Sequence, residues 1–131
     1  MEFMTSLAVG MQKEAQDKVT ARNTAKAVGS GSLPVYATPA MTGLMEKAAA
    51  ELAQEHMPEG WTTVGITLSI AHKAATPVGM AVRAAAKVTK IEGRKISYQV
   101  TAFDEREEIG SGIHERFAVQ EEKFLDKAQK K

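Results

Sequence analysis

The spacing of apolar residues changes once along this chain, from a helical period before Trp61 to a strand period after it. The helical stripe consists of Met41, Leu44, Met45, Ala48 and Leu52. Threonine followed by proline is a typical helix start, so we expect Thr38 to be the N-cap and Pro39 the first helical residue. Pro58 and Gly60 should end this helix. One long helix therefore precedes a region of strands.

Three segments after Trp61 alternate apolar and polar side chains, as half-buried strands do. In the first segment the alternation places five side chains on a single face of the strand: Val64, Ile66, Leu68, Ile70 and His72. The motifs TPVG (76–79) and IEGR (91–94) are predicted turns between the segments. Three adjacent hairpin-linked strands would form an antiparallel meander, with the helix on its buried face. The sequence therefore predicts an α+β fold.

The first forty residues are less regular. Residues 11–19 are consistent with an edge strand whose charges face water. The stretch that follows predicts a short helical turn opened by Thr20 and a Gly/Ser loop over residues 29–32. No repeat or boundary divides the chain, so we expect one domain spanning residues 1–131.

Composition excludes several classes of function. A net charge of +1 over 131 residues gives no electrostatic basis for binding nucleic acid or an anionic membrane. The chain has no cysteine, and its three histidines lack metal-ligand spacing, so we expect no disulfide, thiol nucleophile or metal site. The opening segment MEFMTSLAVGM is too short and too acidic for a signal peptide, and no run reaches membrane-spanning length. We therefore expect a cytoplasmic protein.

Three side chains are candidates for chemistry, and each also has a structural explanation. Glu46 lies on a helical stripe of small residues, where it is either a boundary glutamate paired with Lys47 or a neighbouring subunit, or a partly desolvated general base. The N-cap role alone explains Thr38, although a helix start also stabilises an oxyanion. His72 ends the apolar face of its strand, where a hydrogen-bonded core histidine is the simpler explanation.

Two features of the last strand segment concern packing. His114 has the opposite strand parity to Ile113 and Phe117, so it should face the other side of the sheet. The motif GSG at 110–112 lies inside a strand and does not open a helix, which indicates a bulge or a close contact. These residues alone indicate no chemistry.

The order of three motifs adds a resemblance. The chain contains ATP-x-M-x-x-L-M-E, then H-x-A-A-T-P-x-G, then G-S-G-x-H-E-R. In this combination, from about residue 10 to residue 124, it resembles the hotdog-fold thioesterases of the fluoroacetyl-CoA thioesterase type. The resemblance implies a hotdog fold, in which a long central helix packs on a curved antiparallel sheet. It also implies a homodimer with active sites at the subunit interface, and leaves further association open.

The resemblance also implies a reaction and its residues. It assigns hydrolysis of an acyl-CoA thioester to the threonine of ATP, Thr38, the glutamate of LME, Glu46, and the histidine of the second motif, His72. Gly65, Arg116 and Tyr36 are the implied substrate-binding residues. No cofactor is implied, because CoA is part of the substrate. The residues leave open which acyl group is cleaved and whether Glu46 acts as nucleophile or general base.

Two other functions use the same fold. A hotdog dimer that only binds acyl-CoA or a related hydrophobic ligand would keep the pocket and give Glu46 a structural role. An enoyl-CoA hydratase is the weaker alternative, because no Asp and His share one segment near the helix. Release of free thiol from acyl-CoA distinguishes the hydrolase from the binding protein.

Overall fold

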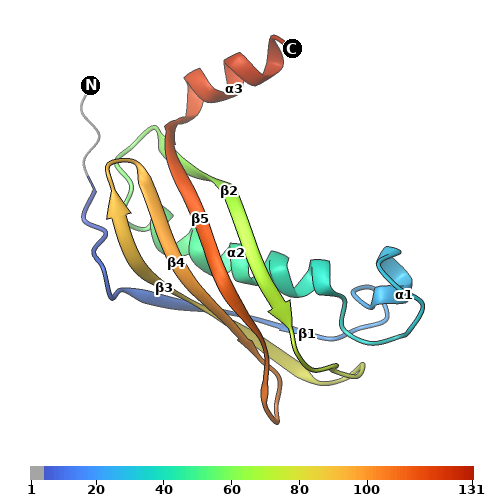
Figure 1. Cartoon of the computed structure of the whole chain (residues 1–131). Helices are drawn as coiled ribbons and strands as arrows, with labels where there is room; N and C mark the ends of the chain where they lie inside the picture. Colours follow the sequence, from blue (N-terminus) through green and yellow to red (C-terminus); the bar gives the residue numbers. More distant parts are fainter. Residues whose placement is uncertain (1–4) are drawn as a thin grey trace.

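The computed structural model describes residues 5–131 and consists of one long helix packed against a curved five-stranded antiparallel sheet (Figure 1). The α+β architecture predicted above is confirmed. Residues 1–4, which begin the segment considered as a leader, lie outside the described residues. Within residues 5–131, no helix combines the length and apolar character needed to cross a membrane. The elements are β1 (Gln12–Lys18), α1 (Ala25–Val28), α2 (Thr38–Gln54), β2 (Trp61–His72), β3 (Ala81–Glu92), β4 (Lys95–Phe103), β5 (Glu108–Gln120) and α3 (Glu121–Gln129).

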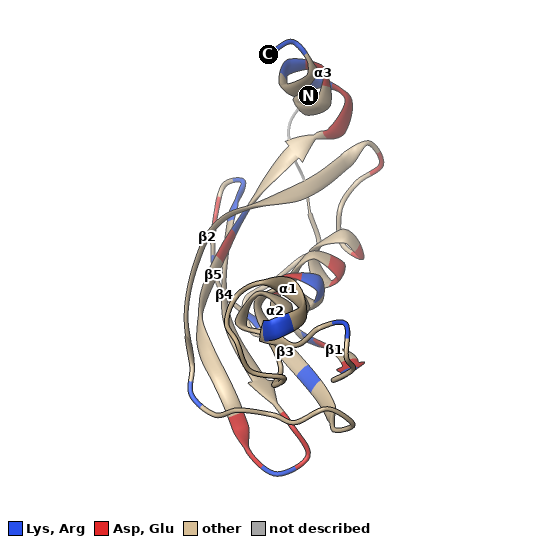
Figure 2. Cartoon of the chain, turned by 90° about the vertical axis from the view of Figure 1, so that its right-hand side faces the viewer, with Lys and Arg blue, Asp and Glu red and all other residues tan. Residues whose placement is uncertain are grey.

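Helix α2 forms the centre of the core. Viewed along its axis in Figure 2, the sheet wraps around it from β2 on one side to β1 on the other. All five residues of the predicted stripe are buried: Met41, Leu44, Met45, Ala48 and Leu52. A Cβ atom on Gly110 of β5 would lie 2.7 Å from the Met41 sulfur, so the glycine lets α2 approach the sheet closely. This confirms the close contact predicted for the GSG motif.

Two predicted helix starts are wrong in detail. Helix α2 begins at Thr38, but Ala37 is its N-cap, and no side chain caps this end. The Thr38 hydroxyl is bonded elsewhere, to His72. Helix α1 begins at Ala25, and its cap is Thr24, whose hydroxyl accepts from the backbone N–H of Ala27. Thr20 instead accepts from the N–H of Arg22 in the preceding turn.

The predicted order of strands is also partly wrong. The sheet order is β1-β3-β4-β5-β2, so β3, β4 and β5 form the meander, whereas β2 pairs with β5 at the far edge. The predicted edge strand near residues 11–19 is confirmed as β1. Segment 73–80 does not fold as a hairpin because residues 35 and 36 hold it: Tyr36 N–H donates to Thr76 O, and Val35 bridges to Pro77. Strand β2 is thereby separated from β3.

A β-bulge interrupts the predicted single face of β2. Gly65 lies opposite Arg116 and Thr67 opposite Glu115, so Ile66 is an extra residue with no partner. The extra residue shifts the alternation: Thr63 and Gly65 share the helix side with Leu68, while Ile66 is 48% exposed. The prediction that Val64 and Ile66 share a face with His72 is therefore wrong. The bulge is what brings Gly65 to the same side of the sheet as α2.

Candidate active site

Thr38 and His72 form a hydrogen-bonded pair where the start of α2 meets the end of β2. The Thr38 hydroxyl oxygen lies 2.7 Å from His72 Nδ1. The other ring nitrogen, Nε2, is buried and has no hydrogen-bond partner among the described residues. Burial lowers the pKa of His72, an effect that the backbone of Ala74 opposes. The imidazole is therefore neutral at pH 7, and its Nε2 atom is shielded from solvent in the single chain.

A cavity of about 270 Å³ lies beside this threonine–histidine pair, and Tyr36 lines it. Tyr36 is buried, and burial raises the pKa of its phenol, so the side chain is uncharged. Its hydroxyl has no hydrogen-bond partner within residues 5–131. The structure thus places the predicted substrate-binding residue Tyr36 next to Thr38 and His72.

Glu46 belongs to a second group, formed with Gly65 and Arg116 and called here the glutamate group. The Glu46 carboxylate lies 3.9 Å from the Arg116 guanidinium. A Cβ atom on Gly65 would lie 3.0 Å from the carboxylate and 3.4 Å from the guanidinium, so a glycine leaves both of them room. In the single chain the Glu46 side chain is 45% exposed, whereas that of Arg116 is 9% exposed. The shelter expected for Glu46 is therefore only partial within one subunit.

Buried hydrogen bonds hold Arg116 in place. Its Nε and Nη2 atoms donate to the hydroxyl and carbonyl oxygens of Thr63, at 2.9 and 3.0 Å. Its Nη1 atom lies 3.1 Å from His114 Nε2, and His114 Nδ1 lies 2.8 Å from the Thr67 carbonyl oxygen. A carbonyl only accepts, so the His114 proton is on Nδ1 and Nε2 accepts from the guanidinium. This chain of bonds fixes the charge that faces Glu46.

Sequence reasoning did not include His114 among the site residues. His114 lies on the opposite side of β5 from Ile113, as predicted. Ile113 is 61% exposed, whereas the side that holds His114 is buried. The available signal was its spacing: His114 and Arg116 are two residues apart on one strand, so they share a face. His114 thus contacts the Arg116 guanidinium of the glutamate group.

The buried, neutral His114 predicts a dependence of stability on pH. Burial is the main cause that lowers the pKa of His114, with Arg116 adding to it. As the pH falls, His114 of the unfolded chain takes up a proton near pH 6.5, roughly the ordinary pKa of histidine. His114 of the native state takes up its proton only at a lower pH. The free energy of unfolding should therefore be fully present above about pH 6.5 and fall by about 1 kcal/mol per pH unit below it.

Urea unfolding at about pH 7.5 and about pH 5.5 measures this loss. His114→Gln should make the loss smaller, because glutamine does not titrate. His56→Gln is the matched control for the effect of the substitution itself, since His56 bonds to Ser6 outside the site. An equal loss in wild type and His114→Gln would contradict the prediction.

The two groups are separated within one chain. Thr38 and Glu46 are eight residues apart on α2, about 12 Å along the helix axis. Among the described residues, no hydrogen bond or ion pair joins Glu46 to Thr38 or His72. Glu46, Gly65 and His114 line a different cavity, of about 230 Å³. The structure thus brings together two of the three predicted catalytic residues and leaves the third apart.

Both groups nevertheless have residues on β2, which contains Gly65 and ends at His72. Within residues 5–131, no group of three or more His, Asp or Glu side chains is placed to hold a metal ion. The arrangement offers a carboxylate, a neutral imidazole, a hydroxyl and a guanidinium. These groups suit acid–base chemistry at a carbonyl.

The fold resembles that of known thioesterases and hotdog proteins. The structure of the fluoroacetyl-CoA thioesterase FlK matches with a TM-score of 0.90 and 32% identity, covering 96% of this chain and 98% of that one. A variant of FlK solved in complex with fluoroacetate and CoA matches with a TM-score of 0.85 and 33% identity, covering 90% and 99%. A hot-dog-like protein from Thermanaerovibrio acidaminovorans has a TM-score of 0.86 and 23% identity, covering 95% and 92%. The predicted hotdog fold is confirmed.

Sequence comparison is more specific. Residues 19–122 match the model of the family described as fluoroacetyl-CoA-specific thioesterase. The fluoroacetyl-CoA thioesterase of Streptantibioticus cattleyicolor is 40% identical over 97 residues, which cover 74% of this chain and 70% of that protein. This chain belongs to the fluoroacetyl-CoA-specific thioesterase family.

Proposed function

We propose that this protein hydrolyses a small acyl-CoA thioester at a site shared between two copies of the chain. One subunit supplies Thr38 and His72, and the partner subunit supplies the glutamate group. The observation that carries the proposal is that a single chain holds these halves apart, yet both have residues on the same edge strand, β2. Family membership supports the reaction class.

The unpaired edge of β2 supports a homodimer. The strand is 12 residues long and is the last in the sheet order, so its outer edge has no partner strand within residues 5–131. Such an edge is a template for pairing with another chain. Antiparallel pairing of β2 with a second copy, about a two-fold axis at Leu68, would set His72 of one subunit opposite Val64 of the other, one residue from Gly65. The two halves of the site would then meet.

In the proposed reaction, Glu46 takes a proton from a water molecule whose oxygen attacks the thioester carbonyl carbon. The carbon–sulfur bond then breaks, and the products are the free acid and CoA, whose thiolate takes up a proton. Direct attack by Glu46 would instead form a mixed anhydride, which water cleaves. Where water cleaves the anhydride at the Glu46 carbonyl carbon, one turnover in ¹⁸O-labelled water separates the routes, because the first product then keeps an unlabelled oxygen from Glu46.

The threonine–histidine pair acts on the carbonyl oxygen and the leaving sulfur of the thioester. With the proton on His72 Nδ1, the Thr38 oxygen accepts it, and its own hydroxyl proton is free for the carbonyl oxyanion at the positive end of α2. With the proton on Nε2, the imidazole can donate to the leaving sulfur. Both tautomers use a neutral His72, which its lowered pKa provides. The reaction needs no cofactor beyond the CoA of the substrate.

A panel of short, branched and aromatic acyl-CoAs, with fluoroacetyl-CoA included, tests the function by detection of free thiol. We expect thiol release from short acyl groups. A ligand-dependent rise in melting temperature without thiol release would instead identify a dimer that only binds acyl-CoA. That outcome would leave the Glu46–Arg116 ion pair as a structural contact.

A further inference from the structure

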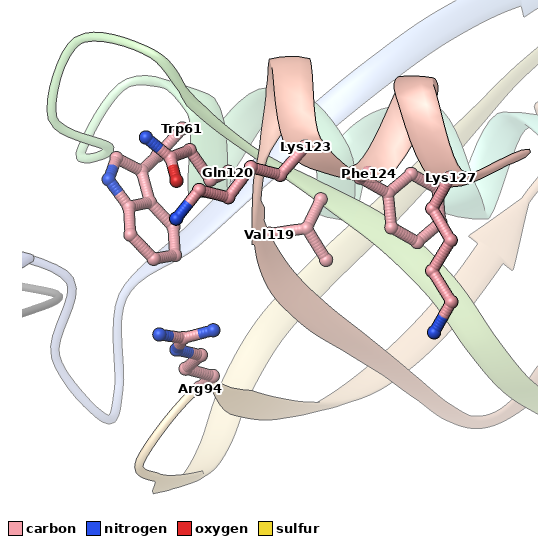
Figure 3. A pocket seen from close by; sticks show the side chains of 7 residues that line it. All are labelled: Trp61, Arg94, Val119, Gln120, Lys123, Phe124 and Lys127. Carbon is pink, nitrogen blue, oxygen red and sulfur yellow. The ribbon is translucent and has the colours of Figure 1, made fainter. Parts of the chain in front are cut away.

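A cavity of about 370 Å³ lies between helix α3 and the end of the sheet, outside the site described above. Figure 3 shows Val119 between Trp61 on one side and Phe124 on the other, with Arg94 below Trp61 and Lys127 below Phe124. We call this cavity the α3 trough. The ring of Phe124 is 46% exposed and is the aromatic surface that the trough offers to a flat heterocycle, whereas Trp61 is 4% and Val119 8% exposed.

The charge of the trough has one sign. Its lining contains three cationic side chains, Arg94, Lys123 and Lys127, and no carboxylate. None of the three forms an ion pair within residues 5–131, and the acidic Glu121 and Glu122 of α3 lie outside the lining. Arg94 stacks on Trp61, with its Cζ atom 4.8 Å from the ring centroid. The trough therefore suits a ligand that combines a planar ring with phosphate groups.

The position of the trough links it to the glutamate group. Trp61 begins β2 and Gly65 lies four residues further on, so they are about 13 Å apart along the strand. An acyl-CoA has its thioester and its phosphorylated adenosine at opposite ends of an extended pantetheine arm. With the thioester at Glu46, an arm that follows β2 toward its start ends near the trough.

We propose that the α3 trough binds the nucleotide end of CoA, with phosphates on Arg94 and Lys127 and the adenine against the apolar wall. This inference rests on the proposed thioesterase function for the identity of the ligand. A free adenine nucleotide has the same chemistry, and competition with CoA separates the two.

Trp61 is the chain's one tryptophan, so its fluorescence reports on the trough directly. Titration with adenosine 3′,5′-bisphosphate should give a saturable change in emission, and CoA should displace this probe. The double variant Arg94→Ala/Lys127→Ala should bind the probe about tenfold more weakly, since it lacks two phosphate-facing charges. Lys87→Ala, on the exposed side of β3, is the matched control and should bind like wild type.

Kinetics give a second, independent readout. In the double variant, KM for acyl-CoA should rise about tenfold with kcat unchanged, whereas hydrolysis of the same acyl group on pantetheine, which has no nucleotide, should not change. Equal probe affinity in wild type and double variant would overturn the proposal that the α3 trough binds the nucleotide. Failure of CoA to displace the probe would also overturn it. Probe binding is measured without turnover, so it does not depend on the proposed hydrolase activity. If CoA displaces the probe but the protein releases no thiol from acyl-CoA, only the hydrolase proposal is refuted.

Discussion

Glu46→Gln is expected to lower kcat for acyl-CoA hydrolysis about 10³-fold while the protein stays folded. Glutamine has nearly the same shape as glutamate and can remain beside Arg116, but it can neither take a proton from water nor attack the carbonyl. The reduction should therefore appear in kcat under both routes of the proposed mechanism. Thiol release at saturating substrate measures it.

Glu51→Gln is the matched control, because Glu51 is an exposed carboxylate of the same helix. It should retain wild-type turnover. Circular dichroism and the elution volume on gel filtration should be the same for both variants. Near-full activity of Glu46→Gln would defeat the assignment of this carboxylate.

Mixing two inactive variants should restore activity if the site is shared. Glu46→Gln spoils one half of every site and His72→Ala spoils the other, so each homodimer should be inactive. After unfolding and refolding together, about half of the dimers contain one chain of each kind, and each of these has one intact site. The mixture should therefore reach about a quarter of wild-type activity.

The control for this experiment places both substitutions on the same chain and mixes that chain with wild type. Under a shared site, every mixed dimer then has two spoiled sites, and only the wild-type homodimers, about a quarter of the total, are active. A site formed within one chain predicts the reverse: no recovery in the first mixture, and about half of full activity in the second.

Local sequence patterns predicted the helices and strands well. The features that they did not predict depend on contacts between residues far apart in the sequence. The stripe from Met41 to Leu52 and the hairpin at Gly93 depend on neighbours in sequence, and both were correctly predicted. The place of β2 at the far edge depends on its pairing with β5, which no local pattern contains. The bulge at Ile66 is likewise defined only by the partner strand.

The candidate site shows the same division. A threonine before a proline fits an N-cap locally, but the Thr38 hydroxyl bonds to a histidine 34 positions away in sequence. The burial of His114 could not be predicted, because its exposed neighbour Ile113 is the more apolar of the two. The grouping of Thr38, Glu46 and His72 came from the resemblance, and the single chain brings together only the first and the last. How Glu46 joins them remains a prediction about a second subunit.

The free edge of β2 has a consequence for how such an enzyme is regulated. In the proposed arrangement a lone subunit has no complete site, so catalysis stops when the two copies separate. Specific activity would then depend on how much of the protein the cell makes, and it would decline on dilution toward the dissociation constant of the pair.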